Sequence, residues 1–198
     1  MNNLQYPLEF QFKVTTLSND FLVRDASGAT LSYVRQKLFK FIDEISVYQD
    51  ESKSGLLYTI KANKWIDFST TYTFTNAAGA EVGRVARKGW ASLWQSRYEV
   101  FDEKQAQDLL IQEENPWVKL GDALFSEIPI IGIFTGYVFN PSYLVTRPDG
   151  TAVVRLQKQP SILGRRFLVS QLNEFESGEE ERIVLSLMMM ILLERRRG

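Results

Sequence analysis

The most regular feature of the chain is an alternation of hydrophobic and polar residues that returns in short segments. Leu8–Val14 alternates over its whole length, and so do the residues on either side of Gly28, Gly79 and Gly150. A side-chain period of two is typical of β-strands that bury one face. Each of these glycines closes a short polar turn, where a positive φ suits glycine better than other residues. The pattern therefore predicts a β-hairpin that is repeated at least three times.

Looser copies fill the gaps between these hairpins. One copy turns through a polar segment that ends at Gly55, and the last strand is expected over Arg166–Leu172. The stretch Glu103–Gln112 fits either a strand or a short helix that is capped by Asp102, with Gln105 at the capping-box position. We favour the strand because it continues the repeat. About a dozen short strands joined by turns predict an antiparallel sandwich or barrel.

The C-terminal segment has a different pattern and predicts a helix near residues 179–196. Glu179–Glu181 lie where a helix N-terminus favours negative charge, and Arg195–Arg197 lie where its C-terminus favours positive charge. Only Ser186 interrupts the apolar run Ile183–Leu193, so this helix must be buried on every side. The run rises only about 16 Å, which is too short to span a bilayer. We therefore expect a mainly β fold, a closed antiparallel barrel of about twelve strands around a buried C-terminal helix. A helix that leaves the barrel and dips into a membrane is the alternative.

A second apolar interruption predicts a helical insertion near residues 115–128. Asn115 fits an N-cap and Pro116 fits the first helical position, and Trp117, Leu120 and Leu124 fall on one face. The apolar residues 130–139 that follow fit a buried strand or loop, or an exposed element that touches a membrane or a partner. We expect residues 1–198 to form a single domain.

Composition excludes several classes of function. The chain has no cysteine and no histidine, so disulfides, thiolate nucleophiles, cysteine–histidine zinc sites and serine–histidine catalysis are impossible. A net charge of −1 gives no global attraction for nucleic acid. No phosphate-binding loop or dinucleotide fingerprint is present, so we expect no cofactor and no metal. The N-terminus lacks a signal-peptide pattern, and no apolar run is long enough for a transmembrane span. We expect a cytoplasmic protein, either free or peripheral to a membrane.

The order of these features resembles the LURP-one-related proteins. The resemblance rests on the repeated strand, Asp/Asn-Gly turn, strand and lysine unit, on Asn115-Pro116-Trp117 and Asn140-Pro141-Ser142-Tyr143, and on the closing apolar helix. It covers roughly residues 8–197. It implies membership of the tubby-like superfamily, which also includes phospholipid scramblases, and a twelve-stranded barrel threaded by a C-terminal helix. Tubby-type domains bind phosphoinositide headgroups through lysine and arginine. The chain departs from the scramblases, because it lacks palmitoylated cysteines and a DxDxDG calcium loop.

Basic residues recur after the turn glycines and are the candidate site. If the repeats stack around a barrel, such positions can gather on one rim, where guanidinium and ammonium groups hold phosphate. The alternative is that they are solvated outward positions of amphipathic strands. The candidates for a lipid headgroup are Arg35, Lys37, Arg84, Arg87, Lys88, Arg155, Lys158, Arg165 and Arg166.

Three aspartates, Asp25, Asp50 and Asp102, lie at matching strand ends. They fit a cation site or, better, turn formers that accept hydrogen bonds from their own backbone. The leading hypothesis is a non-enzymatic binding module that docks on anionic phospholipid headgroups at a membrane surface. A protein-interaction or scaffold module without lipid affinity is the alternative. An enzyme acting in the barrel mouth is the third hypothesis and has the least support, because no carboxylate pair has a diagnostic spacing.

Overall fold

The computed structural model describes residues 4–13, 19–37, 44–63, 70–87, 97–114, 142–160 and 165–195. Within these ranges the chain forms twelve strands and one helix. The strands are β1 (Leu8–Phe12), β2 (Asp20–Arg24), β3 (Thr30–Lys37), β4 (Glu44–Tyr48), β5 (Leu56–Asn63), β6 (Thr70–Asn76), β7 (Glu81–Arg87), β8 (Arg97–Phe101), β9 (Gln107–Glu113), β10 (Ser142–Thr146), β11 (Ala152–Gln159) and β12 (Arg166–Gln171). The helix is α3 (Glu179–Arg195).

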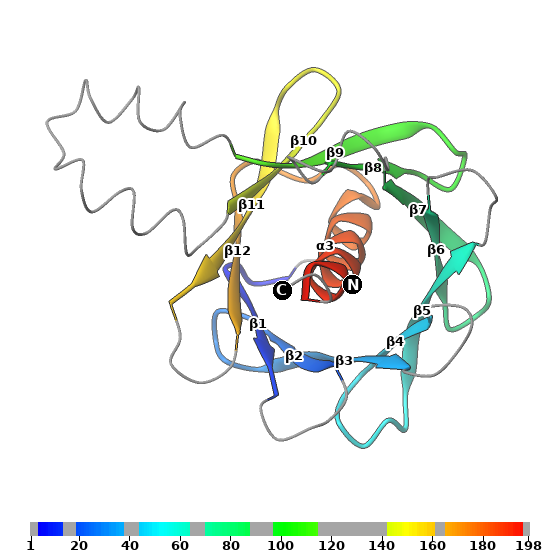
Figure 1. Cartoon of the computed structure of the whole chain (residues 1–198), viewed down its shortest axis with the longest axis vertical. Coiled ribbons are helices and arrows are strands. Elements are labelled where there is room, and N and C mark those ends of the chain that lie inside the picture. Colours follow the sequence, from blue (N-terminus) through cyan, green and yellow to red (C-terminus); the bar gives the residue numbers. More distant parts are fainter. Residues whose placement is uncertain are drawn as a thin grey trace, which may run out of the picture.

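The strands close into one antiparallel barrel. Each strand pairs with the next in sequence, and β1 pairs with β12 from Leu8↔Val169 to Gln11↔Arg166 to complete the ring (Figure 1). The short polar turns predicted from the sequence join the strands in pairs. Closure leaves no unpaired edge among the twelve described strands. The predicted fold class is confirmed.

The lumen of the barrel is filled by α3. Met188, Met189 and Met190 are fully buried, as are Ile183 and Leu187. A helix that is apolar on every side has to be buried all round, and the surrounding strands bury it. The ring in Figure 1 encloses α3, which lies closest to β7 and β8. The strands supply alternate inward side chains, such as Val85 and Val100. On the far side, where the helix is more distant, aromatic rings fill the space: Phe10, Phe12, Phe21 and Phe167.

Gly83 on β7 allows this close approach of helix and wall. A Cβ atom at this position would lie 2.7 Å from the Phe101 carbonyl oxygen and 2.8 Å from Cδ of Arg182. Both contacts are shorter than real Cβ contacts, and φ of Gly83 is +152°. Glycine is therefore required where the Arg182 side chain crosses the wall.

Hydrogen bonds and ion pairs of charged side chains connect the first turn of α3 to the barrel. Arg147, in the β10–β11 turn, donates to both carboxylate oxygens of Glu179, at 2.9 and 2.7 Å. Arg182 donates to Oδ2 of Asp108 on β9 from Nε at 2.7 Å and lies 2.6 Å from it through Nη2. The Leu4 backbone N–H donates to Glu180 at 3.1 Å. We call these residues the collar. The contacts of the collar fix where the helix enters the lumen. They also give hydrogen-bond partners to the charged side chains of the first turn of the helix.

The structure also decides between strand and helix for the residues after Asp102, and it leaves the predicted insertion untested. Gln107–Glu113 is strand β9, which confirms the strand rather than the helix. The helix predicted near 115–128 and the apolar residues 130–139 lie outside the described residues. In the part of the chain that the structure describes, no helix is long and apolar enough to cross a membrane.

Candidate functional site

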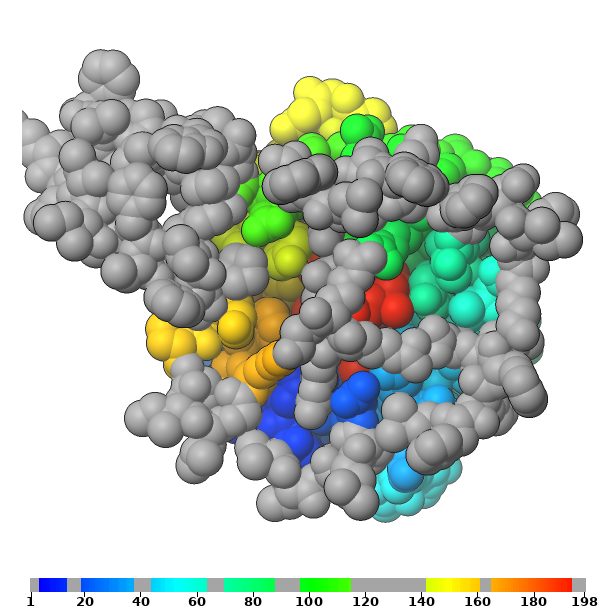
Figure 2. Space-filling model, in the orientation of Figure 1, coloured from blue at the N-terminus to red at the C-terminus, as the bar shows by residue number. Residues whose placement is uncertain are grey.

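The topology gives the barrel two rims of different construction. Because the strands alternate in direction, the short turns after β2, β4, β6, β8 and β10 share one rim with the start of α3. We call it the hairpin rim. The ends of β1, β3, β5, β7, β9 and β11 share the opposite rim, which we call the loop rim. Figure 2 looks onto the loop rim, and red atoms of the C-terminal part of α3 are visible at its centre.

Five of the nine candidate cations lie at the loop rim. Lys37, Arg87 and Lys158 are at or next to the last residues of β3, β7 and β11, and Arg165 and Arg166 are at the start of β12. The remaining described candidates lie further along the strands, in the outer wall: Arg35, Arg84 and Arg155. Lys88 lies outside the described residues.

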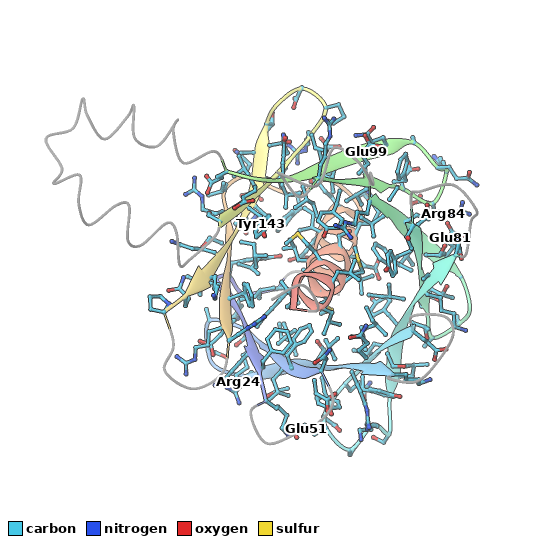
Figure 3. The ribbon with its side chains drawn as sticks, viewed as in Figure 1. Arg24, Glu51, Glu81, Arg84, Glu99 and Tyr143 are labelled. Carbon is cyan, nitrogen blue, oxygen red and sulfur yellow. The ribbon has the colours of Figure 1, made fainter. Side chains whose placement is uncertain are left out.

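Most outward-facing candidates have carboxylate partners. Arg84 is paired with Glu81, and this hydrogen bond raises the pKa of Arg84 above its ordinary value. Figure 3 shows the two side chains together on the outside of the wall. Arg155 lies 3.1 Å from Glu114. An ion pair between partly exposed side chains contributes little to stability. Its cation also attracts a further anion less strongly, because the carboxylate partner offsets its charge. The other outward pairs are Lys37 with Glu44 and, more loosely, Arg166 with Glu9 at 3.8 Å.

Arg87 and Lys158 face the lumen instead. Arg87 is opposite the fully buried Tyr98, and Lys158 is opposite the buried Phe167. Directly opposed residues of an antiparallel pair share one face of the sheet. Both cations are therefore the last inward positions of their strands. The structure brings them to the mouth around the C-terminal end of α3 and separates them from the outer-wall arginines.

The hairpin rim carries the opposite charge. Its described turns and the start of α3, residues 25–29, 49–55, 76–80, 102–106, 147–151 and 172–182, contain eleven Asp or Glu and four Lys or Arg. The described strand ends of the loop rim carry mainly basic residues. The cations there are Lys13, Lys37, Arg87, Arg97, Lys158, Arg165 and Arg166, against Asp20, Glu44, Glu113 and Glu114.

The three aspartates that were candidates for a cation site are turn formers. Oδ1 of Asp25 accepts from the N–H groups of Ser27 and Ala29, and Oδ1 of Asp102 accepts from those of Lys104 and Ala106. Oδ1 of Asp50 accepts from Ser52. The hydrogen bond from the Ser27 hydroxyl holds the pKa of Asp25 below its ordinary value. These carboxylates stabilise the turns, which confirms the interpretation that the sequence favoured.

Sequence reasoning missed the collar and the clefts beside it. One cleft of about 510 Å³ is lined by Asp102, Asp108, Arg147, Pro148, Asp149, Glu176, Ser177, Glu179 and Arg182. A second, of about 540 Å³, is lined by Leu4, Gln171, Glu174, Phe175, Glu176, Ser177, Gly178 and Glu180. Burial raises the pKa of Asp108, although Arg182 opposes this shift. The sequence signal that could have revealed the collar is Arg147, which occupies the turn position where the other turns have Asp or Asn.

Comparison with protein families gives a match over the middle of the chain. The model of the family described as LURP-one-related matches residues 30–127, about half of the chain. The chain belongs to the LURP-one-related family. The matched region of this LURP-one-related protein begins with β3 and extends beyond β9, so it includes the hairpin turns at Asp50, Asn76 and Asp102. No curated protein and no solved structure gave a match.

Proposed function

We propose that this LURP-one-related protein is a non-enzymatic binding module that docks its loop rim on anionic phospholipid surfaces. The observation that carries the proposal is the division of charge between the two ends of the barrel. Basic side chains lie at the described strand ends of the loop rim, and carboxylates gather at the hairpin rim. Such a molecule is oriented by the field of an anionic surface, since the loop rim is attracted and the hairpin rim is repelled.

The near-zero net charge of −1 favours this oriented contact over non-specific adhesion. A protein with a uniform positive surface binds any polyanion, whereas here the attraction depends on which end approaches. Each Lys or Arg close to the surface contributes about 1 kcal/mol, so a few residues of one rim are enough for salt-sensitive binding.

The test is flotation with vesicles of phosphatidylcholine alone or mixed with phosphatidylglycerol, at low and at high salt. We expect binding to the anionic vesicles at low salt, weakened at high salt because the charges are screened. The double variant Arg165→Gln/Arg166→Gln should lose affinity by about fivefold for each residue, on the basis of the same 1 kcal/mol.

The matched control removes two cations from the opposite rim, Lys53→Gln/Lys104→Gln, and should bind like the wild-type protein. Equal losses in both double variants would contradict docking by the loop rim. If the wild-type protein floats with none of the vesicles, the lipid proposal fails. The scaffold alternative then remains, and its partner has to be sought among proteins.

A further inference from the structure

The two ends of the barrel carry opposite charges that do not cancel within either end. The described hairpin rim has eleven Asp or Glu against four Lys or Arg, and the described strand ends of the loop rim have seven Lys or Arg against four Asp or Glu. Ion pairs inside one rim are already included in these numbers. The pair of Lys13 with Glu51 joins the two groups and lowers each excess by one. An excess of carboxylates therefore remains at one end and an excess of cations at the other.

One cleft of the hairpin rim combines carboxylates with an aromatic ring. It has a volume of about 540 Å³, and its described lining includes Glu174, Glu176, Glu180 and Phe175 but no Lys or Arg. Glu180 is buried, whereas Glu174 is exposed. Glu176 lies 3.5 Å from Arg147, but 75% of its side chain is exposed. Exposed carboxylates beside an aromatic ring suit a guanidinium group, which pairs with carboxylates and stacks on rings.

The loop rim of the same chain carries exposed guanidinium groups. Arg97 and Arg166 have 48% and 47% of their side chains exposed, and their nearest described carboxylates are 4.0 and 3.8 Å away. Such exposed, long contacts are weak. Arg165 and Arg166 begin at one end of β12, and Gln171 at the other end lines the cleft. About 17 Å of strand separates them, so one molecule cannot place its own arginines in its own cleft.

We propose that the cleft at the hairpin rim receives the loop rim of a second copy of this chain. The residues in contact are Arg165 and Arg166 of one copy and Glu174 and Glu176 of the next. The two surfaces are complementary in charge, and a net charge of −1 leaves no overall repulsion between copies. Because the two surfaces differ and lie at opposite ends of the barrel, copies associate head to tail into open chains.

This association goes beyond the proposed function and needs no lipid, although both use the loop rim. A loop rim that is bound to a second copy is not free for a membrane. Self-association and lipid docking therefore compete, and anionic vesicles should shorten the chains.

Sedimentation velocity at two salt concentrations measures the association. We expect the sedimentation coefficient of the wild-type protein to rise with protein concentration at about 20 mM salt and to stay at the monomer value at about 300 mM, because salt screens exposed charges. The double variants Arg165→Glu/Arg166→Glu and Glu174→Arg/Glu176→Arg reverse the two sides of the contact. Each should weaken self-association by about tenfold or more, because like charges then face each other.

The decisive measurement mixes the two reversed variants in equal amounts. Alone, each variant has contact patches of the same sign at both ends. In the mixture each patch meets one of opposite sign, so association should return to the strength of the wild-type protein. Lys53→Gln/Lys104→Gln leaves both patches unchanged and should associate like wild type. Circular dichroism of each variant before mixing shows that the barrel is folded.

Three results would overturn the inference. A wild-type protein that stays monomeric at low salt and high protein concentration would exclude the second copy. If it then binds a short oligo-arginine peptide through Glu174 and Glu176, the cleft serves a basic partner protein instead. A dimer that does not grow with concentration would show a closed contact rather than a head-to-tail one. A mixture of the reversed variants that stays monomeric would place the contact on other residues.

Flotation separates this inference from the proposed function. Glu174→Arg/Glu176→Arg keeps the loop rim and should float with anionic vesicles like the wild-type protein, whether or not copies associate. Loss of self-association with retained flotation would therefore remove the second copy and leave the lipid proposal intact.

Discussion

Single residues of the repeated turn show how one local structure tolerates different side chains. Four turns share the same backbone hydrogen bonds, with the first residue bonded to the residues three and four positions later. Asp25, Asn76 and Asp102 occupy the first position and stabilise the turn with Oδ1. In the fourth turn this position is Arg147, and Asp149 accepts from Thr151 instead. The arginine is thereby available for Glu179 of the helix.

Gln105 is the residue at which a turn substitution should stabilise the protein. It takes the glycine position of its turn with φ of 67°, whereas Gly28, Gly79 and Gly150 have φ between 83° and 89°. A left-handed conformation costs an L-residue about 1–2 kcal/mol, which exceeds the entropy that glycine loses on folding. Gln105→Gly should therefore raise the free energy of urea unfolding by about 0.5–1 kcal/mol.

The reverse substitution at an equivalent turn is the control. A Cβ atom at Gly79 would meet no heavy atom within 4 Å, so Gly79→Gln tests the backbone conformation without a clash. It should lower the unfolding free energy by about 1 kcal/mol. An unchanged urea midpoint in both variants would mean that the turn conformation adds nothing to stability.

At the scale of the elements, α3 is the hydrophobic core of the barrel. It cannot be stable alone in water, since nearly all of its surface from Ile183 to Leu192 is apolar and buried. The strands in turn need it, because an empty lumen would leave their inward side chains without partners. Helix and barrel are therefore expected to form together, with the collar setting the depth of the helix.

Met189→Asp should prevent folding. Met189 is fully buried, and an unpaired carboxylate there has no hydrogen-bond partner to offset its desolvation. Met189→Leu, which nearly conserves volume, should cost less than about 1.5 kcal/mol. Far-ultraviolet circular dichroism and size-exclusion chromatography measure both. Soluble, folded Met189→Asp protein would contradict the central position of the helix in solution.

At the scale of the whole molecule, the aspartates of the hairpin rim predict how stability depends on pH. Hydrogen bonds from Ser27, Ser52 and Thr151 hold the pKa values of Asp25, Asp50 and Asp149 below the ordinary value. A depressed pKa in the folded state contributes stability above the unfolded pKa of about 3.9, and this contribution is lost as the pH falls through the depressed value.

We therefore expect the urea midpoint to fall as the pH is lowered below about 4. The double variant Asp25→Asn/Asp149→Asn should show a shallower fall, because asparagine accepts the same backbone bonds without titrating, as Asn76 does. Asp108 has the opposite sign, since its raised pKa makes protonation favour the fold. A fall of the same slope in wild type and variant would show that the turn aspartates do not cause it.

The sequence by itself determined the architecture, because the period of the side chains is a local property. Alternation around each turn glycine identified the strands, and the run Ile183–Leu193 between acidic and basic ends identified a helix too apolar for any surface. Asp25 and Asp102 were recognised as turn formers from their place before the glycine position. The family resemblance rested on the same features.

Only the tertiary structure decided which charged residues act together. Arg84 and Arg87 are three positions apart in one strand, yet Arg84 faces outward to Glu81 and Arg87 faces the lumen. Glu113 drew no notice in the sequence, because its position opposite Tyr143, on the same inner face as Arg87 and Lys158, follows only from the strand register. The collar joins Arg182 to Asp108 across 74 positions of the chain. Local patterns specify the strands, but strand register and barrel closure decide which side chains meet.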